Sequence, residues 1–242
     1  MHRYADSNEI SFKRMSEQRG SNSNSQLKML LSRTDWGEIL KLLEKKSYQR
    51  KFQIVEAFTE LVAEKGLSEV THSDIAKKCR ITRQLVDHHF PDKAALVTLT
   101  YRYIYAGFQK LAADAISARE GFLTQLRAYV DAHFTWLKEK RPHARFLVQF
   151  YALLQVNAEF AAVQERNLKI GQERIAALCI LARREGHFHE VPDEVLKIRA
   201  STFQAYSLGF IAMHVWKDSS RDLKTESQEF WRVTLSILGI QG

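Results

Sequence analysis

Apolar residues recur at helical spacing along most of this chain. A first amphipathic helix is predicted over residues 34–46, with apolar positions in the i, i+3, i+4, i+7 pattern: Trp36, Ile39, Leu40 and Leu43. A second helix is predicted over residues 48–65, and its buried stripe comprises Ile54, Phe58, Leu61 and Val62. Gly66 follows, and we expect it to end this helix in the left-handed conformation that glycine adopts readily.

Two short helices are predicted next. Thr71 and Asp74 have the T-x-x-D spacing of a capping box, so a helix is expected to begin after Thr71. The chain then turns at residues 80–81. Thr82 is placed to cap a third helix that reaches about His89.

Longer helices are predicted for the rest of the sequence, the first of them capped by Asp92. Their ranges are 93–117, 121–139, 143–155, 158–184, 193–215 and 223–238. Glycine (10 residues) and proline (3 residues) are scarce among 242 residues, whereas an all-β chain needs both at its many turns. Pattern and composition together predict an all-α fold.

The three helices that precede residue 90 have the layout of a helix-turn-helix unit, because a tight turn joins the last two. Ile81, Val86 and Phe90 can anchor the third helix to the other two. The outer face of the third helix would then carry Arg83, Gln84, Asp87 and His88. A helix of this size fits the major groove of DNA. The pattern is equally compatible with a small structural three-helix bundle.

Residues 54–96 resemble the N-terminal domain of the TetR family of bacterial repressors. The matching positions are Ala57, Gly66, Thr71, Ile75, Ala76, Ile81, Thr82, His89, Phe90, Lys93 and Leu96. The resemblance implies a homodimer whose three-helix helix-turn-helix domain binds palindromic, double-stranded operator DNA. It further implies a larger helical domain that binds a small-molecule effector and dimerises.

Carried over by position, the resemblance implies DNA contacts from the second and third helices and from the start of the fourth. The residues are Thr71, His72, Ser73, Thr82, Arg83, Gln84, Leu85, Asp87, His88, His89 and Lys93, with Lys93 on a phosphate. Two positions depart from the family. Arg80 stands where glycine is usual, and Asp87 stands where tyrosine is usual. Asp87 would either accept a hydrogen bond from cytosine or repel phosphate.

Four segments follow from these patterns: a flexible basic tail (1–33), an extra amphipathic helix (34–46), the helix-turn-helix domain (47–95) and an effector-binding and dimerisation domain (96–242). The extra helix either covers apolar surface or touches DNA through Arg33, Lys41, Lys45 and Lys46. The net charge of +8 is spread over all segments and does not by itself locate a nucleic-acid site.

The aromatic residues of the middle helices suggest a hydrophobic or aromatic effector, although each fits an ordinary core as well. The candidate pocket residues are Phe108, Tyr129, His133, Phe146, Gln149, Phe150 and Phe203. Apolar residues on more than one face of the last two helices predict that the homodimer forms through them. The sequence shows neither a signal peptide nor an apolar run long enough for a membrane span, so a bacterial cytoplasmic location is expected.

Enzyme chemistry has no support in the sequence. It contains no glycine-rich phosphate loop, no G-x-S-x-G motif and no paired-carboxylate pattern, so no catalytic residue and no cofactor is expected. Residues 187–190 (His-Phe-His-Glu) look like metal ligands but lack a partner pair, so no metal site is expected. Cys79 is interpreted as a small buried apolar residue, with a redox sensor as the alternative.

The function expected from the sequence is that of a homodimeric transcriptional repressor that a small effector releases from its operator. Two other functions remain open. The chain could be an all-α ligand-binding or adaptor protein that has lost operator binding, as Arg80 and Asp87 would allow. It could also be a protein that organises DNA without repressing transcription.

Overall fold

The computed structural model describes residues 36–188, 191–216 and 223–240, and this part of the chain is helical, without a strand. The helix-turn-helix region contains α4 (Lys46–Lys65), α5 (His72–Cys79) and α6 (Arg83–His89), preceded by α3 (Trp36–Leu43). The larger part contains α7 (Lys93–Ser117), α8 (Phe122–Glu139), α9 (Arg141–Leu153), α10 (Ala158–Arg184), α11 (Asp193–His214) and α12 (Leu223–Leu238). The predicted all-α fold is confirmed.

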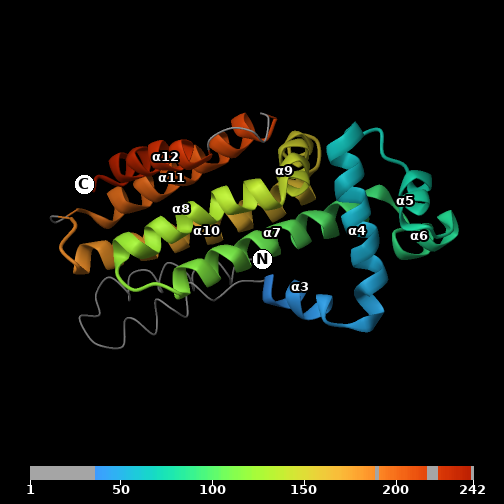
Figure 1. Ribbon diagram of the computed structural model, residues 1–242, viewed down its shortest axis with the longest axis horizontal. Coiled ribbons are helices and arrows are strands. Elements are labelled where there is room, and N and C mark those ends of the chain that lie inside the picture. The colour runs from blue at the N-terminus through green and yellow to red at the C-terminus, as the bar shows by residue number, and fades with distance from the viewer. Residues whose placement is uncertain (1–35, 189–190, 217–222, 241–242) are drawn as a thin grey trace.

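The molecule is elongated, with α7, α8, α10, α11 and α12 running along its length (Figure 1). At one end α4 crosses this bundle steeply, and α5 and α6 lie beyond α4, farthest from the bundle (Figure 1). The short helix α9 packs against α4, so it joins the bundle to the helix-turn-helix region. This layout leaves one side of α5 and α6 free of other helices.

The predicted caps explain where the short helices begin. The hydroxyl of Thr71 accepts a hydrogen bond from the Asp74 amide, and the Asp74 carboxylate accepts one from the Thr71 amide, which completes the capping box. Thr82 accepts a hydrogen bond from the Leu85 amide at 3.2 Å. Asp92 accepts one from the Ala95 amide at 2.7 Å. These side chains satisfy amide groups that the helix itself leaves without partners.

Two turn residues of the helix-turn-helix region, Gly66 and Arg80, have positive φ angles. Gly66 ends α4 at φ 96° and ψ 152°, so the predicted left-handed helical conformation is wrong there. This combination of angles is even more restricted to glycine, because a Cβ atom would clash with the backbone. Arg80 lies at φ 54° and ψ 47°, the left-handed conformation, after the end of α5. A non-glycine residue pays about 1–2 kcal/mol for that conformation.

The helix α3 packs against α7, and the side chain of Ile39 is buried there. This contact favours the docked-extension interpretation of the segment. Lys41, Lys45 and Lys46 are exposed, so the DNA-arm interpretation stays a prediction. The predicted tail, Arg33 and the side chains of Trp36 and Leu40 lie outside the described residues.

Two hydrophobic cores are present among the described residues. The first is built from α4, α5, α6 and the first half of α7, together with α9 and the adjoining ends of α8, α10 and α11. The second is built from the remainder of α7, α8, α10 and α11 with α12. The first core therefore extends past the predicted domain boundary after residue 95, through residues such as Tyr101, Phe146 and Phe150.

The cysteines are both buried and unpaired. Burial raises the pKa of the Cys79 thiol and raises that of Cys179 to about 12. Thiols with raised pKa values are poor nucleophiles, which favours the interpretation of Cys79 as a small apolar residue. Among the described helices, none has a stretch apolar and long enough to cross a bilayer.

Candidate DNA-binding surface and effector site

The outer face of α6 carries most of the residues that the resemblance assigns to DNA. Thr82, Arg83, Gln84 and His88 are exposed, whereas Leu85, Asp87 and His89 are half-buried. Val86 is fully buried and Phe90 is nearly so, and these two residues fix the orientation of the helix against the first core. The predicted division of α6 into an anchored and an outward face is thus observed, apart from Asp87.

Asp87 has partners within the protein that the sequence did not reveal. Its Oδ1 atom lies 2.6 Å from Nδ1 of His72 on α5, and its Oδ2 atom lies 3.5 Å from Nε of Arg83 on α6. Asp87 therefore links the two helices of the motif and holds the base of the Arg83 side chain. The Arg83 side chain remains 69% exposed, so this ion pair is weak and leaves the guanidinium accessible.

On α5, the resemblance assigns DNA contacts to Thr71, His72 and Ser73. Thr71 uses its hydroxyl within the capping box, donating to Oδ2 of Asp74 at 2.6 Å. The ammonium of Lys65 lies 2.8 Å from the same carboxylate, and its hydrogen bond, with those from Thr71, holds the pKa of Asp74 well below the usual value. Ser73 is exposed and His72 is half-buried.

Lys93 begins α7, where the resemblance implies a phosphate contact. Its ammonium donates a hydrogen bond to the backbone carbonyl of Ser68 at 3.0 Å, which fixes the loop between α4 and α5. Burial lowers the pKa of Lys93. An ammonium has three donors, so a phosphate contact by Lys93 is compatible with this bond and stays a prediction.

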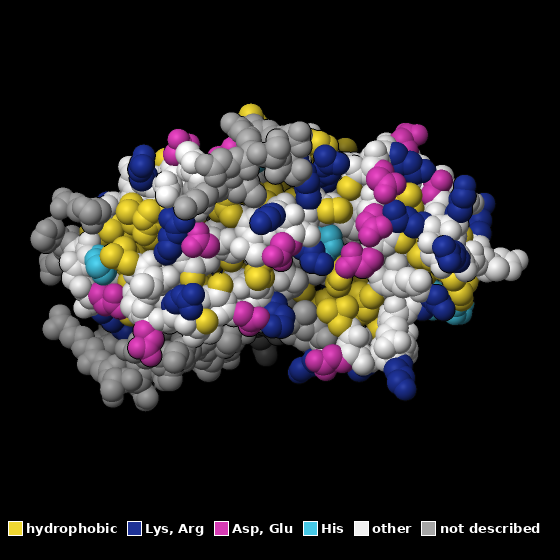
Figure 2. Space-filling view, in the orientation of Figure 1, with side chains coloured by type: hydrophobic (Ala, Val, Ile, Leu, Met, Phe, Trp, Pro, Cys, Tyr) yellow, Lys and Arg dark blue, Asp and Glu magenta, His cyan; other side chains and the backbone are white. Residues whose placement is uncertain are grey.

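Basic residues gather at the α5–α6 end of the molecule, where Figure 2 shows Lys and Arg side chains over the surface. Burial lowers the pKa of His89, and the charges of His88, Lys51 and Arg50 lower it further. Arg50 and Lys51 on α4 thus lie near the end of α6. The rings of His88 and His89 meet edge to face at 5.4 Å. In the part of the chain described here, no three His, Cys, Asp or Glu side chains are grouped as metal ligands, and His189 and Glu190 lie outside that part.

Polar contacts between α9 and α4 join the larger helical region to the helix-turn-helix region. The amide of Gln149 donates to the carbonyl of Val62 at 3.1 Å and accepts from the Leu67 amide at 2.6 Å. Arg145 donates to the Ala63 carbonyl at 3.3 Å. These bonds pair two of the last carbonyls of α4 with side chains of α9.

Glu56 on α4 is the centre of a second polar contact. It accepts a hydrogen bond from the hydroxyl of Tyr103 on α7, and its other oxygen lies 3.2 Å from Nε2 of His143 on α9. Burial acts to raise the pKa of Glu56, but the bonds to His143 and Tyr103 outweigh it and hold the pKa low. Three helices therefore meet at one carboxylate.

The seven predicted effector residues divide into separate groups. Phe108, Tyr129, His133 and Phe203 adjoin one another: the His133 ring lies 4.9 Å from Phe108 and 4.8 Å from Tyr129, and Phe203 lies 6.1 Å from Tyr129. Phe146 and Phe150 stack 6.3 Å apart within the first core. Gln149 forms the contacts to α4 and belongs to neither group.

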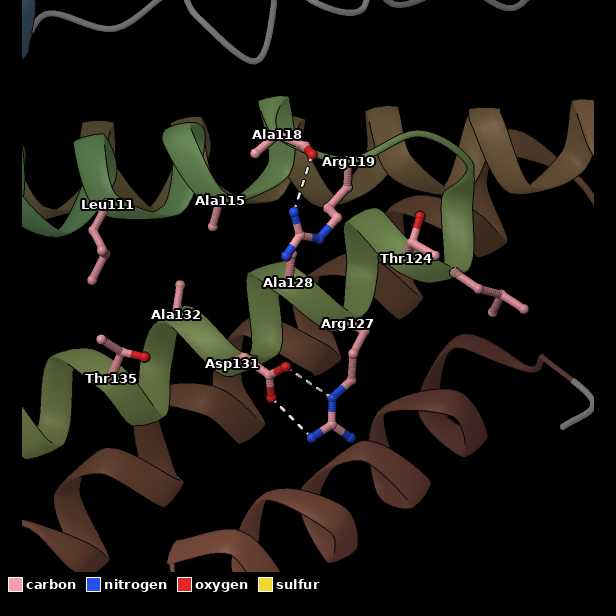
Figure 3. A pocket seen from close by; sticks show the side chains of 11 residues that line it. Leu111, Ala115, Ala118, Arg119, Thr124, Arg127, Ala128, Asp131, Ala132 and Thr135 are labelled. Carbon is pink, nitrogen blue, oxygen red and sulfur yellow. Dashed lines mark hydrogen bonds and ion pairs between the residues drawn. The ribbon is translucent and has the colours of Figure 1, made fainter.

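A pocket of about 460 Å³ lies between α7 and α8 and shares none of these residues. Small side chains such as Ala115 on α7 and Ala128 and Ala132 on α8 line it together with larger ones, among them Leu111 and Arg119 (Figure 3). Arg127 and Asp131 form an ion pair of 2.9 Å beside it (Figure 3). The assignment of the effector residues is therefore still a prediction.

Arg174 on α10 is a further polar residue that sequence reasoning missed. It is buried, and it shares a helical face with Gly171, Ala177, Leu178 and Leu181, all of them buried. An arginine in the middle of an apolar stripe is the sequence signal that would have found it.

Comparisons with known proteins agree with this geometry. The family described as bacterial regulatory proteins, tetR family, matches residues 54–99. The chain is 29% identical over 119 residues to the HTH-type transcriptional regulator BetI of Stenotrophomonas maltophilia, a match covering 49% of this chain and 61% of BetI. The chain thus spans about three fifths of the length of the curated relatives that it matches.

Solved structures share the fold. The fatty acid degradation regulator FadR of Bacillus halodurans superposes with a TM-score of 0.65 at 20% identity, covering 79% of this chain and 100% of that one. AibR in complex with isovaleryl coenzyme A and operator DNA superposes with a TM-score of 0.60 at 15% identity, covering 74% and 95%. Residues 54–99 therefore match the DNA-binding domain of bacterial regulatory proteins of the tetR family, and the described helices share the fold of these solved structures.

Proposed function

We propose that this protein is a transcriptional regulator that binds DNA through α6. The observation that carries this proposal is the exposed face of α6, where Arg83, Gln84 and His88 point outward from a helix anchored by Val86 and Phe90. Arginine binds the guanine edge and glutamine the adenine edge in the major groove. The basic residues near α6 supply the phosphate attraction that DNA binding needs.

A homodimer is the second part of the proposal. Ala200, Phe203, Ser207 and Ile211 of α11 are buried within the chain's own core. The opposite stripe of α11 is exposed and is made of small and apolar residues: Ile198, Thr202, Ala205, Gly209 and Met213. Ile198 is 58% exposed and Met213 is 69% exposed, so a partner helix would remove apolar surface from water. A symmetric operator would need two α6 helices about 34–36 Å apart.

The homodimer has its own test, sedimentation of the full chain at micromolar concentration. A dimer is expected, and Gly209→Glu should convert it to a monomer because it places a charged side chain on the exposed stripe. The substitution should not disturb the single chain, since nothing lies within 4 Å of a Cβ atom at Gly209. A monomeric parent protein would refute both the dimer and the two-half-site operator.

Repression relieved by an effector is the third part. In this mechanism the effector binds only a form of the dimer in which the two α6 helices are wrongly spaced for the operator. Effector binding then lowers the affinity for DNA, and DNA binding lowers the affinity for the effector by the same factor. The bonds from Gln149 and Arg145 to α4 supply a mechanical link for this coupling. The AibR structure, with isovaleryl coenzyme A and operator DNA, supports the view that this fold holds both ligands.

Operator selection from random double-stranded DNA tests the proposal. We expect a single palindromic sequence to be enriched, and Arg83→Ala to relax one base pair in each half-site at a cost of about 1–3 kcal/mol. Lys93→Ala should weaken binding to all sequences alike, because phosphate contacts carry no sequence information. Arg102→Ala, an exposed arginine on α7, is the matched control and should change neither property.

Two other results would change the conclusion. If no sequence is enriched, the protein is a ligand-binding or adaptor protein and not an operator-binding one. If a palindrome is enriched but a reporter gene placed behind it is not repressed, the protein organises DNA without repression.

A further inference from the structure

Arg174 of α10 is an interior cation without a counterion. The residue is 3% exposed. Its Nε, Nη1 and Nη2 atoms have no hydrogen-bond partner anywhere in the described part of the chain. A guanidinium has five N–H donors in a planar fork, and here none of them is satisfied.

Burial of this kind is costly. An unpaired charge in the protein interior loses its hydration without gaining a compensating bond. Burial lowers the pKa of Arg174, yet an arginine keeps its proton in proteins, so the charge remains. An interior guanidinium with every donor vacant is therefore poorly suited to an empty site and well suited to an anionic ligand.

The groups around Arg174 do not supply that anion. Tyr129 and Tyr105 are the side chains that interact with it electrostatically, and burial raises the pKa of both, so both are neutral. The Tyr105 hydroxyl donates a hydrogen bond to the carbonyl of Asn167 at 2.5 Å. Burial lowers the pKa of His133 to about 4, so its imidazole is also neutral near pH 7.

An apolar wall adjoins these groups. Phe108 contacts His133 and Phe203 contacts Tyr129, and the charge of Arg174 acts on both His133 and Tyr129. On α7, one turn beyond Tyr105, the buried Oε1 of Gln109 also lacks a hydrogen-bond partner within the described structure. A ligand with one charged end and an apolar body matches this combination of vacant polar atoms and aromatic rings.

We propose that Arg174 binds the carboxylate of a small organic acid whose apolar body packs against Phe108, Tyr129 and Phe203. A carboxylate carries one negative charge and accepts two parallel N–H bonds from the guanidinium fork, so it neutralises the site. A phosphate dianion would leave an excess charge buried. The role of this acid as an effector rests on the function proposed above. The binding of the acid to Arg174 does not depend on that function.

Arg174 is only 3% exposed, so an acid reaches it only when neighbouring side chains move. Binding is therefore measured at equilibrium, on the full chain and without DNA. The probes are straight-chain monocarboxylates from acetate to decanoate and 4-phenylbutyrate. Each acid is compared with the alcohol of the same carbon skeleton, and choline serves as a cationic probe. Thermal denaturation reports binding because a ligand of the native state raises Tm.

We expect at least one acid to raise Tm, while its alcohol has a much smaller effect. Arg174→Met should weaken the affinity for that acid by about tenfold to a hundredfold, the usual value of bonds to a charged group, and should leave the alcohol unaffected. Arg166→Met, which replaces an exposed arginine of the same helix, is the matched control and should bind the acid as the parent does. Without ligand, Arg174→Met should melt at or above the parent Tm, because it removes an unpaired buried charge.

The proposal is overturned if no acid raises Tm or if Arg174→Met binds the acid as tightly as the parent. Fluorescence anisotropy on the selected operator separates this failure from failure of the proposed function. A recovered palindrome without acid binding refutes the carboxylate site alone. Acid binding that depends on Arg174 without any enriched DNA sequence refutes operator binding and supports the carboxylate site.

Discussion

Gln149 offers a direct test of how the two regions of the molecule are joined. Its side-chain amide donates to the Val62 carbonyl and accepts from the Leu67 amide, so one side chain from α9 satisfies two backbone groups at the end of α4. Gln149→Ala removes both bonds and leaves the Leu67 amide, on a buried residue, without this partner. We expect the variant to fold but to be less stable.

The magnitude follows from the two bonds. A buried donor such as the Leu67 amide, left without its acceptor, costs about 1–3 kcal/mol. Gln149 is only half-buried, so we take the loss of its bond to the Val62 carbonyl as included in that range. A loss of about 2 kcal/mol corresponds to a Tm decrease of roughly 4–8 °C for a chain of this size.

Urea denaturation followed by circular dichroism measures this loss. The matched control is Gln155→Ala, because Gln155 is exposed just beyond α9 and its replacement should change the free energy of unfolding by less than about 0.5 kcal/mol. Coincident unfolding midpoints for Gln149→Ala and the control would refute the argument that α9 supports the end of α4.

Three further substitutions have defined outcomes. Arg80→Gly should change stability by between zero and about +1 kcal/mol in urea denaturation, because relief of left-handed strain exceeds the entropy that glycine adds to the unfolded chain; a clear loss would contradict the backbone assignment. Asp87→Asn should narrow the affinity gap between operator and scrambled DNA in anisotropy titrations, because Arg83 loses its orienting partner while the helix loses a negative charge; an equal change on both DNAs would count against that role. The pKa of His133 is about 4 in the folded protein and about 6.5 when unfolded, so the unfolded state takes up the proton first as pH falls. Stability from this residue is complete above pH 6.5 and decreases by about 3 kcal/mol on going to pH 4, and the difference between the parent and His133→Gln in denaturation at each pH should show this slope.

The sequence predicted helices better than it predicted contacts. Thr71, Thr82 and Asp92 identify helix starts because a cap acts on amides only three residues away. The apolar stripes were informative for the same reason, since each is set by the period of a single helix. The fold class and the outward face of α6 follow from such local signals.

Contacts between helices depend on distances that no local pattern contains. The partnership of Asp87 with His72 spans two helices, and that of Lys93 with Ser68 spans a loop. Gln149 looked like a polar residue for a pocket, because the sequence does not show that the end of α4 lies opposite it. Among aromatic residues, Phe150 and Phe203 have the same chemistry and differ only in which core surrounds them.

The continuity of the first core has a practical consequence for building hybrid regulators. Exchanging DNA-binding regions between family members by cutting the chain after residue 95 would separate Ile54 and Phe58 from Phe146 and Phe150, with which they share one core. Ile54 and Phe58 would then come from one parent and Phe146 and Phe150 from the other, so their packing surfaces would not match. The first core also includes the adjoining ends of α8, α10 and α11, so a hybrid keeps this packing only if those ends are matched together with α9 and the first half of α7.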